Sequence, residues 1–219
     1  PAVVQVGPHR ADVEIPTASG GGVAPVIVLA AAAVGAVAVA LGGVAIARRR
    51  RRVRRVWEIP DPAALTVHRK RLQAAIERAL DGSAPVVVRA ADGRVGAGVT
   101  TAMVDFAQSY RDDYTVAWWI AAQDPQLIAD QMARLAEALG VAAPTDTAEQ
   151  ATTAALATLR VRGRWLLVFD DAGSPRDLAR FLPGGACHVL VGSADPEWGE
   201  HAVVVPPFAR TESVALLRA

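Results

Sequence analysis

The chain has 219 residues, of which 52% are hydrophobic and 5% aromatic, and its formal net charge is +1. Eight of the 23 basic residues but only two of the 22 acidic ones lie before residue 56, so the remainder carries 15 basic against 20 acidic side chains. We expect no nucleic-acid partner for this acidic remainder, because phosphate neutralisation needs clustered positive charge. The lone Cys187 excludes an intramolecular disulfide and a CxxC metal site.

The N-terminal quarter of the chain predicts a membrane anchor. Residues 1–22, which include a Ser-Gly-Gly-Gly run, are expected to form a flexible extracytoplasmic segment. Residues 23–47 contain no charged side chain and are long enough to cross a bilayer as a transmembrane helix. Residues 48–63, a basic juxtamembrane linker, begin with a block of seven arginines. Positively charged residues that flank a transmembrane span stay in the cytoplasm. We therefore expect a single-pass protein of the cell membrane with its N-terminus outside and its C-terminal domain cytoplasmic.

Three other interpretations of this quarter compete with the anchor. A secretory signal peptide would be shorter and would carry its positive charge before the apolar run. A buried core helix is not normally followed by such an arginine block. The block could bind nucleic acid, but beside an apolar span we expect it to contact anionic membrane lipid. The small residues four apart, Ala31/Gly35 and Ala38/Gly42, are compatible with self-association of the span.

After residue 64 the pattern alternates between helix and strand. Apolar periodicity predicts helices over 65–80, 100–110, 125–139 and 147–159, with Thr147 as the N-cap of the last, and Ser174-Pro175 opens a short one. Short apolar runs predict strands over 85–90, 114–120, 165–169, 188–192 and 202–205. This order predicts an α/β fold in which helices cover both faces of a parallel sheet, giving three layers.

A glycine-rich run follows the first of these strands and has the spacing of a phosphate-binding loop. The pattern G-x-x-x-x-G-K-[ST] puts Gly93 and Gly98 where the backbone wraps phosphate oxygens, and Thr100 where a hydroxyl holds Mg²⁺. The lysine position holds Val99, and the only lysine of the chain, Lys70, lies well upstream. The candidate nucleotide-binding residues of this run are Gly93, Arg94, Gly96, Gly98, Thr100 and Thr101.

The apolar strand over 165–169 ends in a pair of acids. A carboxylate at this place would hold Mg²⁺ together with Thr100, and an adjacent acid could polarise an attacking water. Asp170 and Asp171 are therefore the catalytic candidates, and Thr100 and Asp170 are the candidate metal ligands. The alternative is that the two acids form only a polar strand end and turn.

Together these motifs resemble the NB-ARC-type members of the STAND class of P-loop NTPases, in particular the actinobacterial versions that usually carry tetratricopeptide repeats downstream. The resemblance covers residues 64–219: 93–101 matches Walker A, 165–171 matches Walker B, and 114–125 matches a middle motif with paired tryptophans. It implies a P-loop NTPase-like fold, ADP or ATP with Mg²⁺, a role in signal transduction, and protein partners. In this family a Gly-Arg pair contacts the adenine side of the nucleotide, and His68-Arg69 stands at its place in this chain. The family's sensor of the γ-phosphate directly follows the position of Ser193. Arg69 and Ser193 therefore join the candidate nucleotide-binding residues.

Two departures from the family pattern bear on hydrolysis. Val99 replaces the Walker A lysine, and Ala194 stands where the family usually has an arginine that senses the γ-phosphate. Because both charges stabilise phosphoryl transfer, we expect weak or absent ATP hydrolysis. Arg94 is either a substitute cation or a solvated loop residue. The alternative to a nucleotide switch is a catalytically dead pseudo-NTPase that acts as a protein-interaction scaffold.

We therefore expect five segments in this chain. They are the extracytoplasmic segment 1–22, the transmembrane helix 23–47, the basic linker 48–63, an NB-ARC-like nucleotide-binding domain over 64–208, and the start of a truncated helical subdomain over 209–219. Since the chain begins with Pro1 rather than Met, we expect it to be a piece of a longer protein.

Overall fold

A computed structural model describes residues 55–64, 66–82, 85–91, 96–161, 163–185, 187–199 and 202–218. Within these residues the chain alternates between strand and helix, as its pattern predicts. The sheet has six strands in the order β1-β3-β4-β5-β2-β6, and every neighbouring pair is parallel. The strands are β1 (Val56–Glu58), β2 (Val86–Ala90), β3 (Val116–Ala121), β4 (Trp165–Asp170), β5 (His188–Gly192) and β6 (Ala202–Val205).

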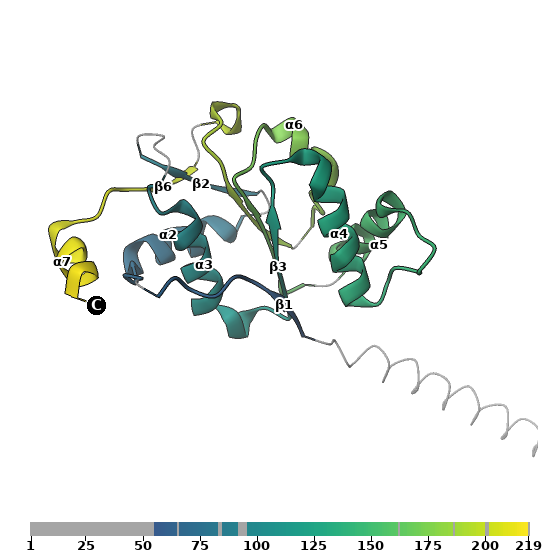
Figure 1. The fold of residues 1–219 in the computed structure, drawn as a ribbon, viewed down its shortest axis with the longest axis horizontal. Helices are drawn as coiled ribbons and strands as arrows, with labels where there is room; N and C mark the ends of the chain where they lie inside the picture. Colours follow the sequence, from purple (N-terminus) through teal and green to yellow (C-terminus); the bar gives the residue numbers. More distant parts are fainter. Residues whose placement is uncertain are drawn as a thin grey trace, which may run out of the picture. The chain divides into compact units, whose positions relative to one another are not determined.

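Helices cover both faces of this sheet (Figure 1). The helices are α2 (Lys70–Leu80), α3 (Val99–Ser109), α4 (Pro125–Leu139), α5 (Ala148–Val161), α6 (Pro175–Leu178) and α7 (Arg210–Arg218). Three single 3₁₀ turns, η1 (Arg111–Asp113), η2 (Ala179–Phe181) and η3 (Pro196–Trp198), lie in the connections. The α/β class and the parallel sheet predicted from the sequence are thus confirmed.

Two separate apolar cores show that the sheet is buried on both faces. On one face α4 and α5 pack against alternate strand residues such as Trp165, Leu167 and Phe169. On the other face α2 and α3 pack against the residues between them, Leu166 and Val168. Because successive side chains of a strand point to opposite faces, a strand buried on both sides must be apolar on both, as β4 is from Trp165 to Phe169.

The predicted helix ends agree with the structure where a polar side chain or a glycine caps the helix. Helix α4 begins after Asp124, whose side chain accepts a hydrogen bond from the backbone of Gln126 at 2.9 Å, and it ends at Gly140 in the left-handed conformation. At the start of α5, Thr147 Oγ1 accepts from Gln150 N at 3.3 Å, while Gln150 Oε1 accepts from Thr147 N at 2.9 Å. This reciprocal pair confirms Thr147 as the N-cap.

Two parts of the fold differ from the prediction by more than two residues. Helix α2 begins at Lys70 rather than at residue 65, and residues 66–69 are irregular chain along the pocket described below. Val56–Glu58, which the sequence places in a basic linker, forms the edge strand β1 and pairs with Val116–Trp118 of β3. The folded part of the chain therefore begins before residue 64. Strand β1 has only three residues and gains its stability by pairing with β3, so no local pattern reveals it.

Among the described residues, no helix is both long and apolar enough to cross a membrane. The predicted transmembrane helix over 23–47, the segment 1–22 and most of the arginine block lie outside the described residues.

Candidate functional site

The carboxyl ends of the parallel strands bring the two sequence motifs together. The glycine-rich run leads from β2 into α3, and the paired acids end β4, with β5 lying between these two strands. Thr100 Oγ1, in the first turn of α3, donates to the Asp170 carboxylate and lies 3.1 Å from each of its oxygens. Two residues that are 70 positions apart in the chain thus form one polar site at the edge where parallel α/β sheets usually bind ligands.

The described part of the glycine run has a backbone that only glycine adopts easily. Gly96 has φ +84° and Gly98 has φ +86°, both in the left-handed region. Gly98 is also the N-cap of α3, so the free N–H groups of the first helical turn begin at Val99. Backbone N–H groups at a helix N-terminus attract anions without any side-chain charge. The start of α3 therefore presents free backbone N–H groups although the lysine of the motif is replaced by Val99.

Gly192 at the end of β5 allows Asp170 and α3 to approach each other. A Cβ atom on Gly192 would lie 2.6 Å from Met103 Cε, 3.1 Å from Asp170 Oδ1 and 3.3 Å from Val99 Cγ1. Val99 is half-buried and packs against the α2/α3-side core. The Val99 side chain, which occupies the position of the motif's lysine, thus packs next to Gly192.

The immediate surroundings of Asp170 disfavour its negative charge. Burial raises the pKa of the Asp170 carboxyl, and the neighbouring charge of Asp171 raises it further, while the hydrogen bond from Thr100 lowers it. Asp171 itself is exposed and has a left-handed backbone, with φ +58°. Among the described residues, neither acid forms an ion pair with a basic side chain.

Thr100 and Asp170 fit a Mg²⁺ ion as adjacent ligands. Two oxygens bound at right angles to Mg²⁺, each at about 2.0–2.1 Å, are about 2.9 Å apart, and the oxygens observed here are 3.1 Å apart. No cluster of three or more His, Cys, Asp or Glu side chains that could hold a metal occurs in the described part of the chain. Mg²⁺ sites that also use substrate phosphates need only one or two carboxylates from the protein.

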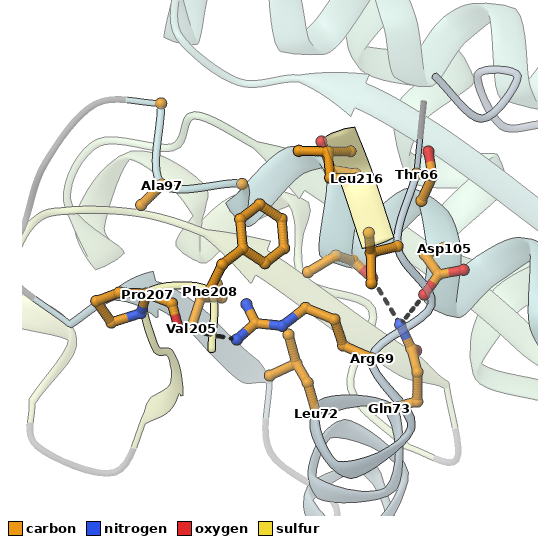
Figure 2. A pocket seen from close by; sticks show the side chains of 15 residues that line it. Thr66, Arg69, Leu72, Gln73, Ala97, Asp105, Val205, Pro207, Phe208 and Leu216 are labelled. Atoms are coloured by element: carbon orange, nitrogen blue, oxygen red, sulfur yellow. Dashed lines mark hydrogen bonds between the residues drawn. The ribbon is translucent and has the colours of Figure 1, made fainter. Parts of the chain in front are cut away.

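A pocket of about 480 Å³ is lined in part by the same two glycines, Gly96 and Gly98. Figure 2 shows this pocket from close by. Its walls come from the chain before α2, the start of α3, the end of β6 and the C-terminal segment. The lining residues include Thr66, Val67, Arg69, Leu72, Gln73, Gly96, Ala97, Gly98, Thr101, Ala102, Asp105, Val205, Pro207, Phe208 and Leu216. The size is typical of a small-molecule site. The lining combines apolar side chains with five polar or charged ones, namely Thr66, Arg69, Gln73, Thr101 and Asp105.

Arg69 joins the start of α2 to the C-terminal segment across one wall of this pocket. Its Nε donates to Glu212 Oε1 at 3.2 Å, and a terminal guanidinium nitrogen donates to the Pro207 carbonyl at 3.4 Å. The guanidinium also lies 5.1 Å from the ring centre of Phe208. Figure 2 shows the two labelled side chains next to each other on this wall. The arginine predicted as a nucleotide contact therefore lines the pocket, with its charge balanced by Glu212 of α7.

A second polar group of the pocket was not predicted from the sequence. Gln73 Nε2 donates to Asp105 Oδ2 at 2.6 Å, and His68 Nδ1 lies 3.0 Å from Asp105 Oδ1. Gln73 is buried, and its Oε1 has no hydrogen-bond partner among the described residues. A glutamine on the apolar stripe of α2, between Leu72 and Ile76, was the sequence feature that could have indicated this cluster.

The remaining predicted residues divide into three groups. Gly96, Gly98 and Thr101 line the pocket together with Arg69. Ser193 does not: its hydroxyl donates to the Ala172 carbonyl at 2.6 Å and accepts from Asp195 N at 3.0 Å, so it fixes the turn after β5. Gly93 and Arg94 lie outside the described residues.

A scan against protein-family models finds no match for this chain, and a search of curated proteins finds no significant relative.

Proposed function

We propose that this chain is a membrane-anchored signalling module of the NB-ARC/STAND type that binds ADP or ATP as a switch and hydrolyses it weakly or not at all. The observation that carries this proposal is the hydrogen bond between Thr100 and Asp170 beside the left-handed glycines. A hydroxyl and a carboxylate at these two motif positions are what a nucleotide-bound Mg²⁺ requires.

In this proposal the two parts of the site hold the two ends of a nucleotide. The base occupies the pocket beside Leu72 and Phe208, whose apolar surface suits a planar ring. The phosphates lie at the start of α3, where the backbone N–H groups that follow Gly98 attract negative charge. Thr101 lines the pocket next to those N–H groups and marks the junction of the two parts.

Thr100 and Asp170 would hold Mg²⁺, which when bound neutralises phosphate oxygens and orients them. Thr100 donates a hydrogen bond to Asp170 in the present structure. Its hydroxyl would therefore rotate so that an oxygen lone pair faces the metal. Asp171 is exposed beside Asp170 and would accept a proton from an attacking water. Slow hydrolysis is proposed because Val99 and Ala194 stand at the two positions where the family motif has cations.

The cellular setting of this module is part of the same proposal. Residues 23–47 would hold the folded domain at the cytoplasmic face of the membrane, with the arginine block contacting anionic lipid. Helix α7 would begin the family's helical subdomain, and it contacts the nucleotide domain through the Arg69–Glu212 ion pair. Protein partners, including a second copy, would respond to nucleotide-dependent changes at this contact.

Calorimetric titration of the whole chain in detergent with ADP and Mg²⁺ tests the proposal. We expect weak but saturable binding at micromolar to millimolar ADP, and no loss of binding in the matched control Asp130→Asn, an exposed carboxylate on α4. Absence of binding at millimolar ADP would overturn the proposal. ATP turnover should equal that of the double variant Asp170→Ala, Asp171→Ala, which gives the background rate.

A second candidate function is a pseudo-NTPase scaffold that binds no nucleotide. Two observations favour it: Val99 packs against the protein at Gly192, and Ala194 is exposed where the family's sensor arginine would stand. Under this alternative the natural chain binds neither ADP nor ATP, and the double variant Val99→Lys, Ala194→Arg gains nucleotide affinity. Saturable ADP binding by the natural chain excludes it.

A further inference from the structure

One wall of the pocket consists of hydrogen-bond acceptors. Asp105 of α3 lines the pocket, and 15% of its side chain is exposed. Gln73 Nε2 donates to Asp105 Oδ2 at 2.6 Å, as the dashed line in Figure 2 marks, and His68 Nδ1 lies 3.0 Å from Oδ1. A carboxylate has about four lone-pair positions, so these two neighbours leave part of its accepting capacity to another donor.

The Gln73 amide adds a second acceptor to this wall. Its Nε2 faces two acceptors, Asp105 Oδ2 and the Ala102 carbonyl at 3.5 Å. The reverse orientation would place the amide oxygen against both, so Oε1 is turned away from them. Gln73 lines the pocket and is 3% exposed, and its Oε1 has no hydrogen-bond partner among the described residues. Because a buried acceptor without a partner is unfavourable, this wall favours a ligand that brings a donor.

The acceptor wall, formed by Asp105 and Gln73, lies away from the proposed phosphate position. Asp105 is seven residues beyond Gly98, the N-cap of α3, and one helical turn beyond Thr101, which also lines the pocket. Since a helix rises 1.5 Å per residue, Asp105 is about 10 Å along α3 from the place proposed for the phosphates. In a nucleotide the ribose follows the phosphates directly and the base lies beyond it. The acceptor wall therefore meets the base.

The number of acceptors distinguishes between the donors that a nucleotide carries. An exocyclic amine has two N–H donors, which match the Asp105 carboxylate and Gln73 Oε1. A ribose hydroxyl has one donor and would leave one of the two acceptors without a partner. A ring carbonyl oxygen would face the carboxylate with no hydrogen between them. The wall therefore suits a base that bears an amine.

We propose that Asp105 accepts a hydrogen bond from the exocyclic amine of the bound base and that Gln73 positions this carboxylate. Gln73 Oε1 accepts the second N–H, and because this atom is buried, its side chain turns slightly toward the pocket when the base binds. The inference rests on the proposed function, because it takes the base to occupy this pocket. It goes further by naming two residues outside the sequence motifs that determine which base is bound.

Three diphosphates titrated into the whole chain in detergent with Mg²⁺ test this proposal. They are ADP, purine riboside 5′-diphosphate, which differs from ADP only by lacking the amine, and 2′-deoxy-ADP. We expect ADP to bind at least tenfold more tightly than the purine analogue, since hydrogen bonds to charged groups contribute about that much. We expect 2′-deoxy-ADP to bind within about threefold of ADP.

Each other outcome has a distinct meaning. Equal affinities of ADP and the purine analogue would overturn the inference while leaving the proposed function intact. The same holds if only 2′-deoxy-ADP loses affinity, because the donor would then be the ribose hydroxyl. Absence of binding by all three ligands would instead overturn the proposed function.

Variants of the acceptor wall assign the preference to its residues. The one oxygen of the amide in Asp105→Asn would be used by Gln73 Nε2, so the preference for ADP over the purine analogue should shrink to within about threefold. Gln73→Leu should reduce the same ratio, whereas Asp130→Asn, at an exposed position of α4, should keep it. A purely structural role would weaken both ligands alike and leave the ratio unchanged.

Circular dichroism first establishes that the variants fold. An unchanged ratio in folded Asp105→Asn would overturn the assignment of this carboxylate. If that variant does not fold, the three ligands on the natural chain decide the proposal, because the loss of the amine alone must weaken binding.

Discussion

Thr100 and Asp170 are joined by a hydrogen bond of 3.1 Å, although 70 positions separate them in the chain. The bond links the first turn of α3 to the end of β4 across β5, and Gly192 of β5 leaves the space for it. Because the three residues come from three different elements, the polar site exists only when the sheet is assembled. Its properties can therefore be tested through stability as well as through binding.

Removing the charge of Asp170 should stabilise the protein at neutral pH. The folded-state pKa of Asp170 is raised, so its contribution to stability is present below the unfolded pKa of about 3.9 and is lost as the pH rises through the folded pKa. We expect Asp170→Asn to raise the Tm at pH 7 by at most about 2–4 °C, because the carboxylate is partly exposed and screened.

The difference between Asp170→Asn and the natural chain should shrink as the pH falls toward 4, which thermal melts at several pH values can follow. Asp130→Asn, at an exposed position of α4, should leave the Tm unchanged at every pH. An Asp170→Asn protein that melts below the natural chain at pH 7 would contradict the electrostatic interpretation.

Adding one methyl group at Gly192 should destabilise the protein. The new Cβ would meet Met103 Cε at 2.6 Å and Asp170 Oδ1 at 3.1 Å, so the ends of these two side chains must shift, and Met103 is fully buried. We expect Gly192→Ala to cost about 1–3 kcal/mol in the free energy of unfolding, the usual cost of overpacking. Gly163→Ala is the control, since its Cβ would meet nothing within 4 Å, and equal losses for the two variants in denaturant titrations would refute this account.

Gly98 should matter for both stability and ligand binding, whereas Gly140 should matter for stability alone. Both have a left-handed backbone, with φ +86° and +68°, so either Gly→Ala change should cost about 1–2 kcal/mol. Only Gly98 lines the pocket and begins α3. We expect ADP affinity to fall at least tenfold in Gly98→Ala and to stay unchanged in Gly140→Ala. Equal ADP affinity in the two variants would exclude the glycine run as the phosphate site.

His188 should make stability depend on pH near neutrality. Its Nδ1 lies 2.8 Å from Tyr114 Oη, and burial lowers its pKa below the ordinary value of 6.5, with Asp81 opposing the shift. Between the lowered pKa and about pH 7 the unfolded state binds more protons, so the free energy of unfolding decreases as the pH falls through this window. His188→Gln should flatten the Tm profile between pH 7.5 and 5.5, and an identical slope in both proteins would refute this role.

Local patterns were sufficient to predict most of the fold. Strands β5 and β6 and helix α4 have the predicted bounds, because apolar runs end at clear turn residues and α4 is capped by Asp124 and Gly140. Strand β1 escaped prediction because three residues next to an arginine block carry little pattern of their own. Its existence depends on pairing with β3, which is a tertiary effect.

The sequence predicted only those residues of the candidate site that belong to a recognisable motif. The spacing of the glycines and the acids indicated Thr100 and Asp170, because fixed motifs carry their geometry with them. The rest of the pocket wall was not predictable, since Gln73, Asp105 and Phe208 come from three separate segments and meet only in the folded chain. Ser193 was predicted from the family motif as a nucleotide contact, and in the structure its hydroxyl donates to the Ala172 carbonyl.

Photolabelling with an azido-adenine analogue of ADP tests the central claim most directly, since it reports both binding and place. The whole chain is irradiated with the analogue, digested and analysed by mass spectrometry, with excess ADP as the competitor. We predict label on the peptides that carry the pocket wall around Leu72 and Phe208, and loss of that label with excess ADP. Label confined to other peptides, or label that ADP does not displace, would contradict the assignment of this pocket as the adenine nucleotide site.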